Sequence, residues 1–188
     1  MDVLTPRGQE SRTQEERAIA IWQSRFPHIA YIHTPKDSPA VVDAILVRDG
    51  QIVGVVETKC RPQLTVLQFS MDYQSRWLVT KKKIDDGVQI AKSLCVPYVG
   101  FLFLPDADLL LYQTIWRPGE GYVCDITIAD TRTQATINGG SIVRTNAFID
   151  MSKAKFIAGD ENERRTDFGA VPNSGEEVGG EGRGGASS

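Results

Sequence analysis

The sequence predicts an α/β domain in which a central mixed sheet is flanked by helices on both faces. Apolar runs rich in β-branched residues alternate along the chain with segments whose apolar residues recur at helical spacing. Two of these runs, residues 40–47 and 51–59, are separated by Asp49-Gly50, a dipeptide typical of tight hairpin turns. This alternation favours a single mixed sheet covered by helices.

A helix and three strands are expected first. Thr13 can cap the helix, Glu16 would complete a capping box, and Pro27 ends the element. Glu15 lies on the apolar face of this helix, whereas Glu16 points about 100° away from it. The apolar residues of that face are Ala18, Ile19, Trp22 and Phe26. The three strands are expected at residues 29–33, 40–47 and 51–59.

Two more helices are expected further along the chain. Pro62 can open the first, which would carry Leu64, Leu67 and Met71 on one side. Residues 77–80 then predict a short strand or a helix end. The second helix is amphipathic, because apolar residues repeat at intervals of four, three and four. These residues are Ile84, Val88, Ala91 and Cys95.

Strands are expected again after this helix. Residues 97–104 predict a buried strand, and a turn at 105–108 leads into a second strand at 109–115. From Thr127 the periodicity weakens, with a turn expected at 138–140 and a strand at 141–144. Three polar residues of this region have no evident chemical role and are expected on the surface or in turns. They are Asn138, Arg144 and Asn146.

Composition divides the chain into a domain and a tail. Residues 160–188 lack apolar periodicity, are rich in Gly and Glu, and predict a disordered acidic segment. This segment holds much of the acidity behind the net charge of −3, so residues 1–159, the expected domain, are nearly neutral. Contact with a nucleic acid would therefore need a local basic patch.

A cytoplasmic protein is expected, in a prokaryote or a phage-infected host. No apolar stretch approaches the roughly 20 residues of a membrane helix, and the N-terminal segment lacks the apolar core of a secretory signal. The three cysteines, Cys60, Cys95 and Cys124, are too few and too widely spaced for a disulfide framework or a CxxC metal knuckle. Free thiols that are buried or half-buried are expected instead.

Two acids and a lysine interrupt the most apolar part of the sequence. Asp43 stands among valines, and Glu57 and Lys59 stand at the end of the following run. An ionised carboxylate inside a sheet is costly unless it is paired, and a hairpin would bring these three side chains together. The arrangement suits a divalent cation held by carboxylate oxygens beside an ammonium group. A strand-end salt bridge is the alternative, but it gives no reason for Asp43.

A helix, three strands, an aspartate and then Glu-x-Lys at a strand end resemble the PD-(D/E)XK nuclease superfamily. The resemblance covers roughly residues 13–115 and departs from the motif at Val42, which stands where the family has proline. It implies a restriction-endonuclease-like αβββαβ core. Asp43, Glu57 and Lys59 match the catalytic positions.

The resemblance also implies a metal cofactor, Mg²⁺, for which Mn²⁺ can substitute. Asp43, Glu57 and the backbone carbonyl of Thr58 would be ligands, while the Thr58 side chain points to the opposite face. Lys59 would orient or deprotonate the attacking water, or stabilise developing charge. Many members add an acid from the first helix; Glu15 is the candidate and Glu16 the reserve. Either acid could instead serve only the helix N-terminus.

One dense basic cluster follows the motif. Three lysines begin the amphipathic helix, where the helix dipole disfavours positive charge. The cluster could bind a DNA backbone, or it could be a solvated helix start. Its residues, together with a nearby arginine, are Arg61, Arg76, Lys81, Lys82 and Lys83.

These expectations combine into a small, metal-dependent nuclease that acts on DNA. One alternative is a structure-selective endonuclease resembling Holliday-junction resolvases, which would act as a homodimer. A second alternative is a non-catalytic nucleic-acid-binding or assembly protein on the same fold. The motif is shared by endonucleases and exonucleases, so it leaves the strand form and the direction of cleavage open.

Overall fold

The computed structural model describes residues 6–35, 40–134 and 141–159. The expected acidic tail and the expected turn at 138–140 lie outside these residues. The described chain contains helices α1 (Pro6–Arg25), α2 (Val66–Met71) and α3 (Lys81–Leu94), and a 3₁₀ turn η1 (Pro105–Ala107). None of these helices combines the length and the apolar character needed to cross a membrane.

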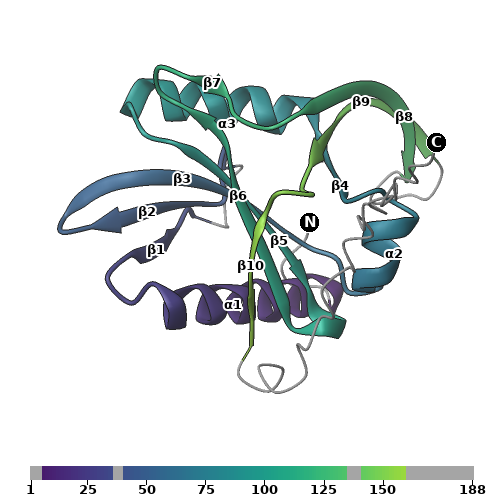
Figure 1. Cartoon of the computed structure of the whole chain (residues 1–188), viewed down its shortest axis with the longest axis horizontal. Helices are drawn as coiled ribbons and strands as arrows, with labels where there is room; N and C mark the ends of the chain where they lie inside the picture. Colours follow the sequence, from purple (N-terminus) through teal and green to yellow (C-terminus); the bar gives the residue numbers. More distant parts are fainter. Residues whose placement is uncertain (1–5, 36–39, 135–140, 160–188) are drawn as a thin grey trace, which may run out of the picture.

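The strands of the described chain form two sheets (Figure 1). The central sheet has the order β1-β2-β3-β5-β6-β10, with β7 added beside β6. Its strands are β1 (Ala30–His33), β2 (Ala44–Arg48), β3 (Gln51–Cys60), β5 (Tyr98–Leu104), β6 (Leu109–Arg117), β7 (Gly121–Tyr122) and β10 (Lys155–Ala158). β3 and β5 are parallel, and the other pairs are antiparallel. The predicted mixed sheet is confirmed.

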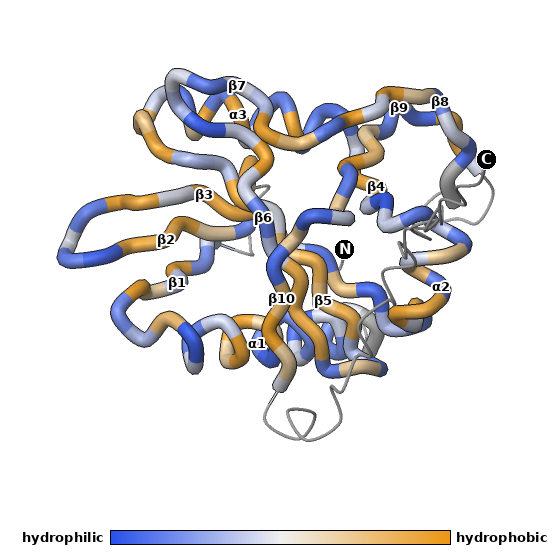
Figure 2. Tube along the Cα trace, in the orientation of Figure 1, coloured by the Kyte–Doolittle hydropathy of each residue, from blue (hydrophilic) through white to orange (hydrophobic). Residues whose placement is uncertain are grey.

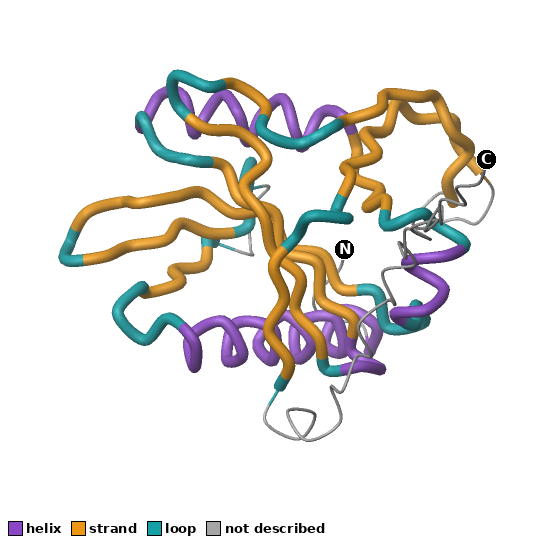
Figure 3. Tube along the Cα trace, viewed as in Figure 1, coloured by secondary structure: helices purple, strands orange, loops and turns teal. Residues whose placement is uncertain are grey.

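The second sheet has the order β4-β9-β8 and packs beside the first. Its strands are β4 (Arg76–Thr80), β8 (Ile126–Gln134) and β9 (Ser141–Asp150). Figure 3 shows these strands grouped to one side of the central sheet. With α2 and β4 taken as an insertion, the order α1-β1-β2-β3-α3-β5 is the predicted αβββαβ core of the restriction-endonuclease-like fold.

Helices cover both faces of the central sheet, as predicted. α1 packs on one face, where Ala18, Ile21 and Trp22 join Phe101 in a core cluster. α3 and the second sheet pack on the other face, where Ile84 and Val88 meet Trp77 and Tyr98. All seven residues of β5 are buried between these layers, and Figure 2 shows the hydrophobic colouring of the central strands. A strand buried on both faces is uniformly apolar for this reason.

The hairpin between β2 and β3 has the predicted turn. Asp49 and Gly50 both adopt positive φ angles, 51° and 75°, which is the left-handed geometry that matches strand twist. The pairing begins at Arg48↔Gln51 and ends at Ala44↔Val56. β3 therefore continues beyond Ala44, the first residue of β2, and its last residues pair with β5 alone.

The predicted start of the first helix was wrong. α1 already includes Pro6, and Thr13 lies inside it, where its hydroxyl donates to the Gln9 carbonyl at 3.2 Å. Glu16 accepts from Arg12 one turn earlier. A Thr-x-x-Glu pattern also occurs within helices, so the spacing alone did not identify the end.

The α2 helix is shorter than predicted and faces the core differently. Thr65 caps it in a capping box with Gln68, and Phe69 is the residue it buries. Leu67 and Met71 are 71% and 70% exposed, so two of the three residues expected on the apolar side point to solvent, whereas Leu64 packs partly against the core. The helix was expected to start at Pro62, but it starts at Val66 after the Thr65 cap, so a different set of residues faces the core.

The burial of two residues, Asn146 and Cys95, differs from what was expected. Asn146 is fully buried in β9 rather than at the surface, and its amide donates to Thr131 of β8 at 2.7 Å. Cys95, expected on the apolar face of α3, is the exposed left-handed residue that ends that helix. Arg144 is exposed on β9. The strands β8 and β10 were not predicted, because β8 consists mostly of polar residues and β10 has only four residues, too few to show a periodicity.

A glycine decides how closely α3 approaches β5. A Cβ added at Gly87 would meet the Tyr98 ring far inside van der Waals contact. We predict that Gly87→Ala destabilises the protein by about 1–2 kcal/mol, because overpacking outweighs the gain in helix propensity of up to about 1 kcal/mol. Urea unfolding measures this change. Gln89→Ala, at an exposed position of the same helix, is the control and should shift stability by under about 0.5 kcal/mol. A stabilised Gly87→Ala variant would contradict the close approach.

Candidate active site

The candidate site lies where β3 extends beyond β2. Asp43 immediately precedes β2, and its backbone N–H still donates to the Val56 carbonyl at 3.0 Å. The next N–H on the same side of β3, that of Thr58, has no backbone partner on β2 and donates instead to Asp43 Oδ2 at 2.8 Å. The carboxylate is therefore held rigidly at the free edge of β3. The Thr58 carbonyl faces the same edge, because the N–H and C=O of a strand residue point to the same side.

Glu57 and Lys59 project from one face of β3, as their spacing predicts. Glu57 is fully buried, and its Oε1 lies 2.9 Å from Lys59 Nζ. Thr58 points to the opposite face, where its hydroxyl and that of Tyr31 are 2.9 Å apart. The predicted orientation of all three side chains is confirmed.

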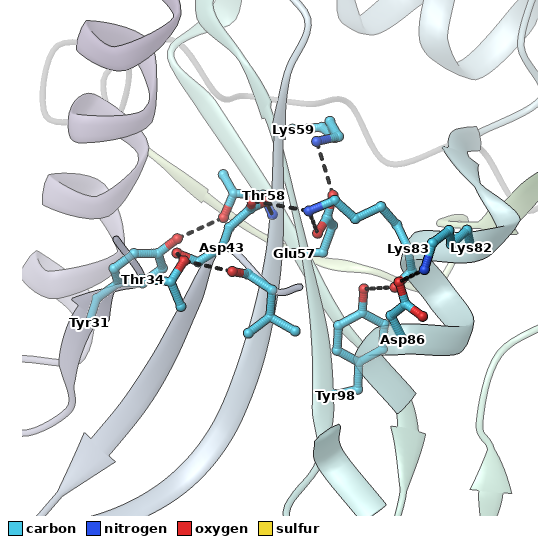
Figure 4. Close-up of polar contacts among 11 residues, drawn as sticks. Tyr31, Thr34, Asp43, Glu57, Thr58, Lys59, Lys82, Lys83, Asp86 and Tyr98 are labelled. Carbon is cyan, nitrogen blue, oxygen red and sulfur yellow. Dashed lines mark hydrogen bonds and ion pairs between the residues drawn. The ribbon is translucent and has the colours of Figure 1, made fainter. Parts of the chain in front are cut away.

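A second lysine joins these residues from α3. Lys83 Nζ lies 3.2 Å from Glu57 Oε2 and 3.6 Å from Asp43 Oδ1 (Figure 4). Tyr98 fixes the backbone of this helical turn, because its hydroxyl donates to the Lys83 carbonyl at 3.3 Å. Two carboxylates and two ammonium groups therefore gather at the end of β3.

The electrostatics of this group follow from burial. Burial raises the pKa of Glu57, the charge of Asp43 adds to the shift, and Lys59 and Lys83 oppose it. For Lys59, burial alone would lower the pKa, but the carboxylates of Glu57 and Asp43 outweigh it and raise the pKa. Lys59 is therefore an ammonium at neutral pH. Each charge at this site depends on a partner of opposite sign.

The donor set fits Mg²⁺. Within the described ranges, no group of three or more His, Cys, Asp or Glu side chains is arranged to hold a metal ion. Asp43 and Glu57 nevertheless lie close enough together to share the ammonium of Lys83. Mg²⁺ is commonly held by one or two carboxylates, with water and substrate phosphate completing its shell. Two carboxylates and the Thr58 carbonyl are sufficient for that mode of binding.

Glu15 and Glu16 differ in position as predicted. Glu15 is half-buried on the sheet side of α1, whereas Glu16 is exposed and paired with Arg12. Burial raises the pKa of Cys60 to about 12, and the charge of Glu15 contributes to that shift. Glu15 thus lies toward the end of β3. Its role as a further ligand stays a prediction.

The predicted basic cluster is divided among three places. Lys81 and Lys82 pair with acids one turn later, Asp85 and Asp86, and line a pocket of about 770 Å³. Lys83 also lines this pocket, but its ammonium pairs with Glu57 and Asp43. Arg61 and Arg76 line a different pocket of about 1080 Å³, where the Arg61 guanidinium donates to the Leu78 carbonyl at 3.2 Å.

Lys83 is the residue whose place in the site the sequence did not indicate, since it forms ion pairs with Glu57 and Asp43. It was grouped with the lysines that would bind a DNA backbone. One sequence signal separates it: Lys81 and Lys82 each have an aspartate four residues later, whereas Lys83 has Gly87. That signal shows that Lys83 lacks the same local partner. It does not identify Glu57 and Asp43 as the partners, which depend on how α3 packs.

The contact behind the site gives a stability test. Tyr31→Phe should lower the free energy of unfolding by about 1 kcal/mol, because the buried Thr58 hydroxyl loses its partner. Thr58→Val should lower the free energy of unfolding by a similar amount, because the Tyr31 hydroxyl then loses its partner. The double variant should cost less than the sum of the two single variants, since replacing both polar groups leaves neither unpaired. Additive effects in urea unfolding would place the two hydroxyls apart.

Comparison with known proteins yields one structural likeness to report. No family model matches the sequence, and no curated protein matches it. A solved structure that resembles the chain is Hjc, a Holliday junction resolvase from the archaeal hyperthermophile Archaeoglobus fulgidus. The two share 12% sequence identity with a TM-score of 0.43, over 75% of this chain and 93% of that chain. The fold assignment rests on the element order and strand pairing described above.

Proposed function

We propose that this protein is a metal-dependent nuclease that hydrolyses phosphodiester bonds in DNA. The observation that carries the proposal is the convergence of Asp43, Glu57 and Lys59 at the free end of β3. Asp43 reaches this point because it immediately precedes the first residue of β2, Ala44, and Glu57 and Lys59 reach it from the same face of β3. The three residues come from two adjacent strand ends, at an edge of the sheet that a substrate can approach.

A purely structural role explains this arrangement poorly. Burying an ionised carboxylate costs several kcal/mol, and an ion pair offsets that cost only with good geometry. Well-packed apolar residues at such positions are often equally or more stabilising. A fully buried Glu57 with a second carboxylate beside it is therefore unfavourable as a packing solution. The arrangement is expected where the acids have a chemical task.

Asp43, Glu57 and the Thr58 carbonyl would hold Mg²⁺ or Mn²⁺. When bound, the cation neutralises phosphate charge and lowers the pKa of water beside it. Asp43 is positioned for this by its bond to the Thr58 N–H, which leaves its other oxygen directed at the site. Glu15 would add a carboxylate if a substrate or cation draws α1 and the end of β3 together.

Lys59 would act on the scissile phosphate or its attacking water. The Lys59 side chain is about one-third exposed while its ammonium stays paired with Glu57. A cation held in this place can orient a water molecule and stabilise negative charge as it develops on the phosphate oxygens. The fully buried Glu57 keeps the ammonium in position.

The DNA backbone would approach along the pocket beside the site. Lys81 and Lys82 line this pocket at the start of α3, with Arg144 across from them on β9. Since these side chains belong to the same rim as Lys83, a phosphate bound here lies next to the acidic site. Such contacts supply affinity without reading sequence.

One observation favours a second candidate, a nucleic-acid-binding protein without cleavage activity. Lys83 already balances the acids, so Asp43, Glu57, Lys59 and Lys83 together carry no net charge. Labelled single-stranded, duplex and four-way DNA, each incubated with Mg²⁺, Mn²⁺ or EDTA, separates the candidates. Cleavage with metal and none with EDTA supports the nuclease, and preference for the four-way substrate indicates a structure-selective endonuclease. Binding without cleavage under every condition supports the second candidate.

We predict that Asp43→Ala and Glu57→Ala each reduce DNA cleavage at least about 100-fold, because each removes a proposed metal ligand. Circular dichroism should show the parent secondary structure in both. Glu120→Ala is the matched control, since it removes an exposed carboxylate paired only with Arg117. Cleavage within a few-fold of the parent in either site variant would refute the metal site. Glu15→Ala and Glu16→Ala, assayed in parallel, test whether Glu15 alone affects cleavage.

We also predict that the double substitution Lys81→Ala and Lys82→Ala raises KM and leaves kcat close to the parent value. The two lysines line the pocket and pair with Asp85 and Asp86 rather than with the proposed metal ligands. Their loss should therefore weaken DNA binding without affecting the chemical step. The salt dependence of DNA binding should become shallower, because fewer counterions are released. Lys92→Ala with Lys153→Ala removes the same charge elsewhere and serves as the control. An unchanged salt slope would show that phosphate does not bind here.

A further inference from the structure

Each of the four carboxylate oxygens of the site lies within hydrogen-bond or ion-pair distance of an N–H or an ammonium group. Asp43 Oδ2 accepts the Thr58 N–H, and Glu57 Oε1 lies 2.9 Å from Lys59 Nζ. The two oxygens that remain, Asp43 Oδ1 and Glu57 Oε2, share one cation. Lys83 Nζ lies between them, at 3.6 Å and 3.2 Å (Figure 4). Any cation that uses this pair of oxygens must therefore take the place of the Lys83 ammonium.

Sharing the pair is unfavourable on both distance and charge. Mg²⁺ binds oxygen at about 2.0–2.1 Å, so a cation on both oxygens would stand against the ammonium. Two positive charges at such separation repel strongly beside a buried carboxylate. Glu57 is fully buried, so solvent screens this repulsion little.

The Lys83 side chain has an adjacent pocket into which it can rotate. Its side chain is 30% exposed, and the residue lines the pocket of about 770 Å³ with Lys81 and Lys82. The backbone of its turn is held by Tyr98, so displacement requires rotation of the side chain alone. An ammonium released into the pocket would add its charge to the surface proposed to bind phosphate.

We propose that Lys83 is a built-in counter-cation of the acidic site, which a divalent cation must displace in order to bind Asp43 and Glu57. The inference rests on the proposed metal site and adds to it a residue that weakens metal affinity. Lys83 neutralises the two acids when no metal is bound. Its release couples occupation of the site to the charge of the adjacent pocket.

The direct test is Mn²⁺ binding without DNA. Isothermal titration calorimetry should give a Kd for Lys83→Met at least about tenfold lower than for the parent, a difference of about 1.4 kcal/mol. Lys92→Met, which removes an equal charge from the other end of α3, should bind Mn²⁺ as the parent does. Addition of Asp43→Ala to Lys83→Met should abolish the tight binding, which assigns it to this site.

Thermal unfolding provides a second readout. Without metal, Lys83→Met should melt below the parent, because Asp43 and Glu57 lose one of their two cations. Saturating Mn²⁺ should raise its melting temperature by more than it raises that of the parent, since tighter binding stabilises the native state further. Lys83→Gln, which keeps a polar head without the charge, replaces Lys83→Met if the latter does not fold.

A third measurement uses the parent protein and needs no variant. The rate at which acetic anhydride modifies each lysine is measured by mass spectrometry with and without Mn²⁺. Displacement predicts that Lys83 reacts several-fold faster when Mn²⁺ is present, whereas Lys92 is unchanged. A Lys83 rate that falls or stays constant at saturating Mn²⁺ would overturn the inference.

The outcomes separate this inference from the proposed function. If the parent binds Mn²⁺ and cleaves DNA, but Lys83→Met binds Mn²⁺ no more tightly, the inference fails and the nuclease proposal stands. If Lys83→Met binds more tightly through Asp43 and no DNA is cleaved under any condition, the inference stands and the nuclease proposal fails. If neither protein binds Mn²⁺ at millimolar concentration, both are overturned.

Discussion

The buried carboxylate of Glu57 is the constraint on which the site depends. It has no access to solvent, and a second carboxylate lies close by. Such a group is tolerated only where cations reach it, and two do so from different elements. Lys59 follows Glu57 by two residues on the same strand, whereas Lys83 follows it by 26 residues and belongs to α3. The first of these pairings is local, while the second ties α3 to the sheet.

That tie depends on close packing rather than on charge alone. Gly87 leaves room for the ring of Tyr98, and the Tyr98 hydroxyl meets the Lys83 carbonyl one turn earlier. α3 can therefore lie low over β5, with Lys83 above the end of β3. The three lysines at the start of this helix are explained in the same way: two are paired with acids one turn later, and the third reaches the site.

The site also lies at the junction of the two hydrophobic cores. Val42 and Val55 belong to the core beneath α3, while Ala44 and Val56 belong to the core beneath α1. Asp43 stands between these layers, immediately before β2 begins. Its position is thus fixed from both faces of the sheet, which is the preorganisation that a metal-dependent hydrolase requires. A neutral resting state held by Lys83 would keep these acids stable until a cation arrives.

The sequence by itself determined the elements and the faces of most of them. Alternation placed Glu57 and Lys59 on one side of a strand and Thr58 on the other, and the Asp-Gly turn aligned Asp43 with them. It missed β8, β10, the inward face of α2, the burial of Asn146 and the ion pairs of Lys83 with Glu57 and Asp43. Periodicity reports which side of its own element a residue occupies, because that depends on local backbone geometry. Which partner the side chain meets depends on how distant elements pack, and this only the tertiary structure decided.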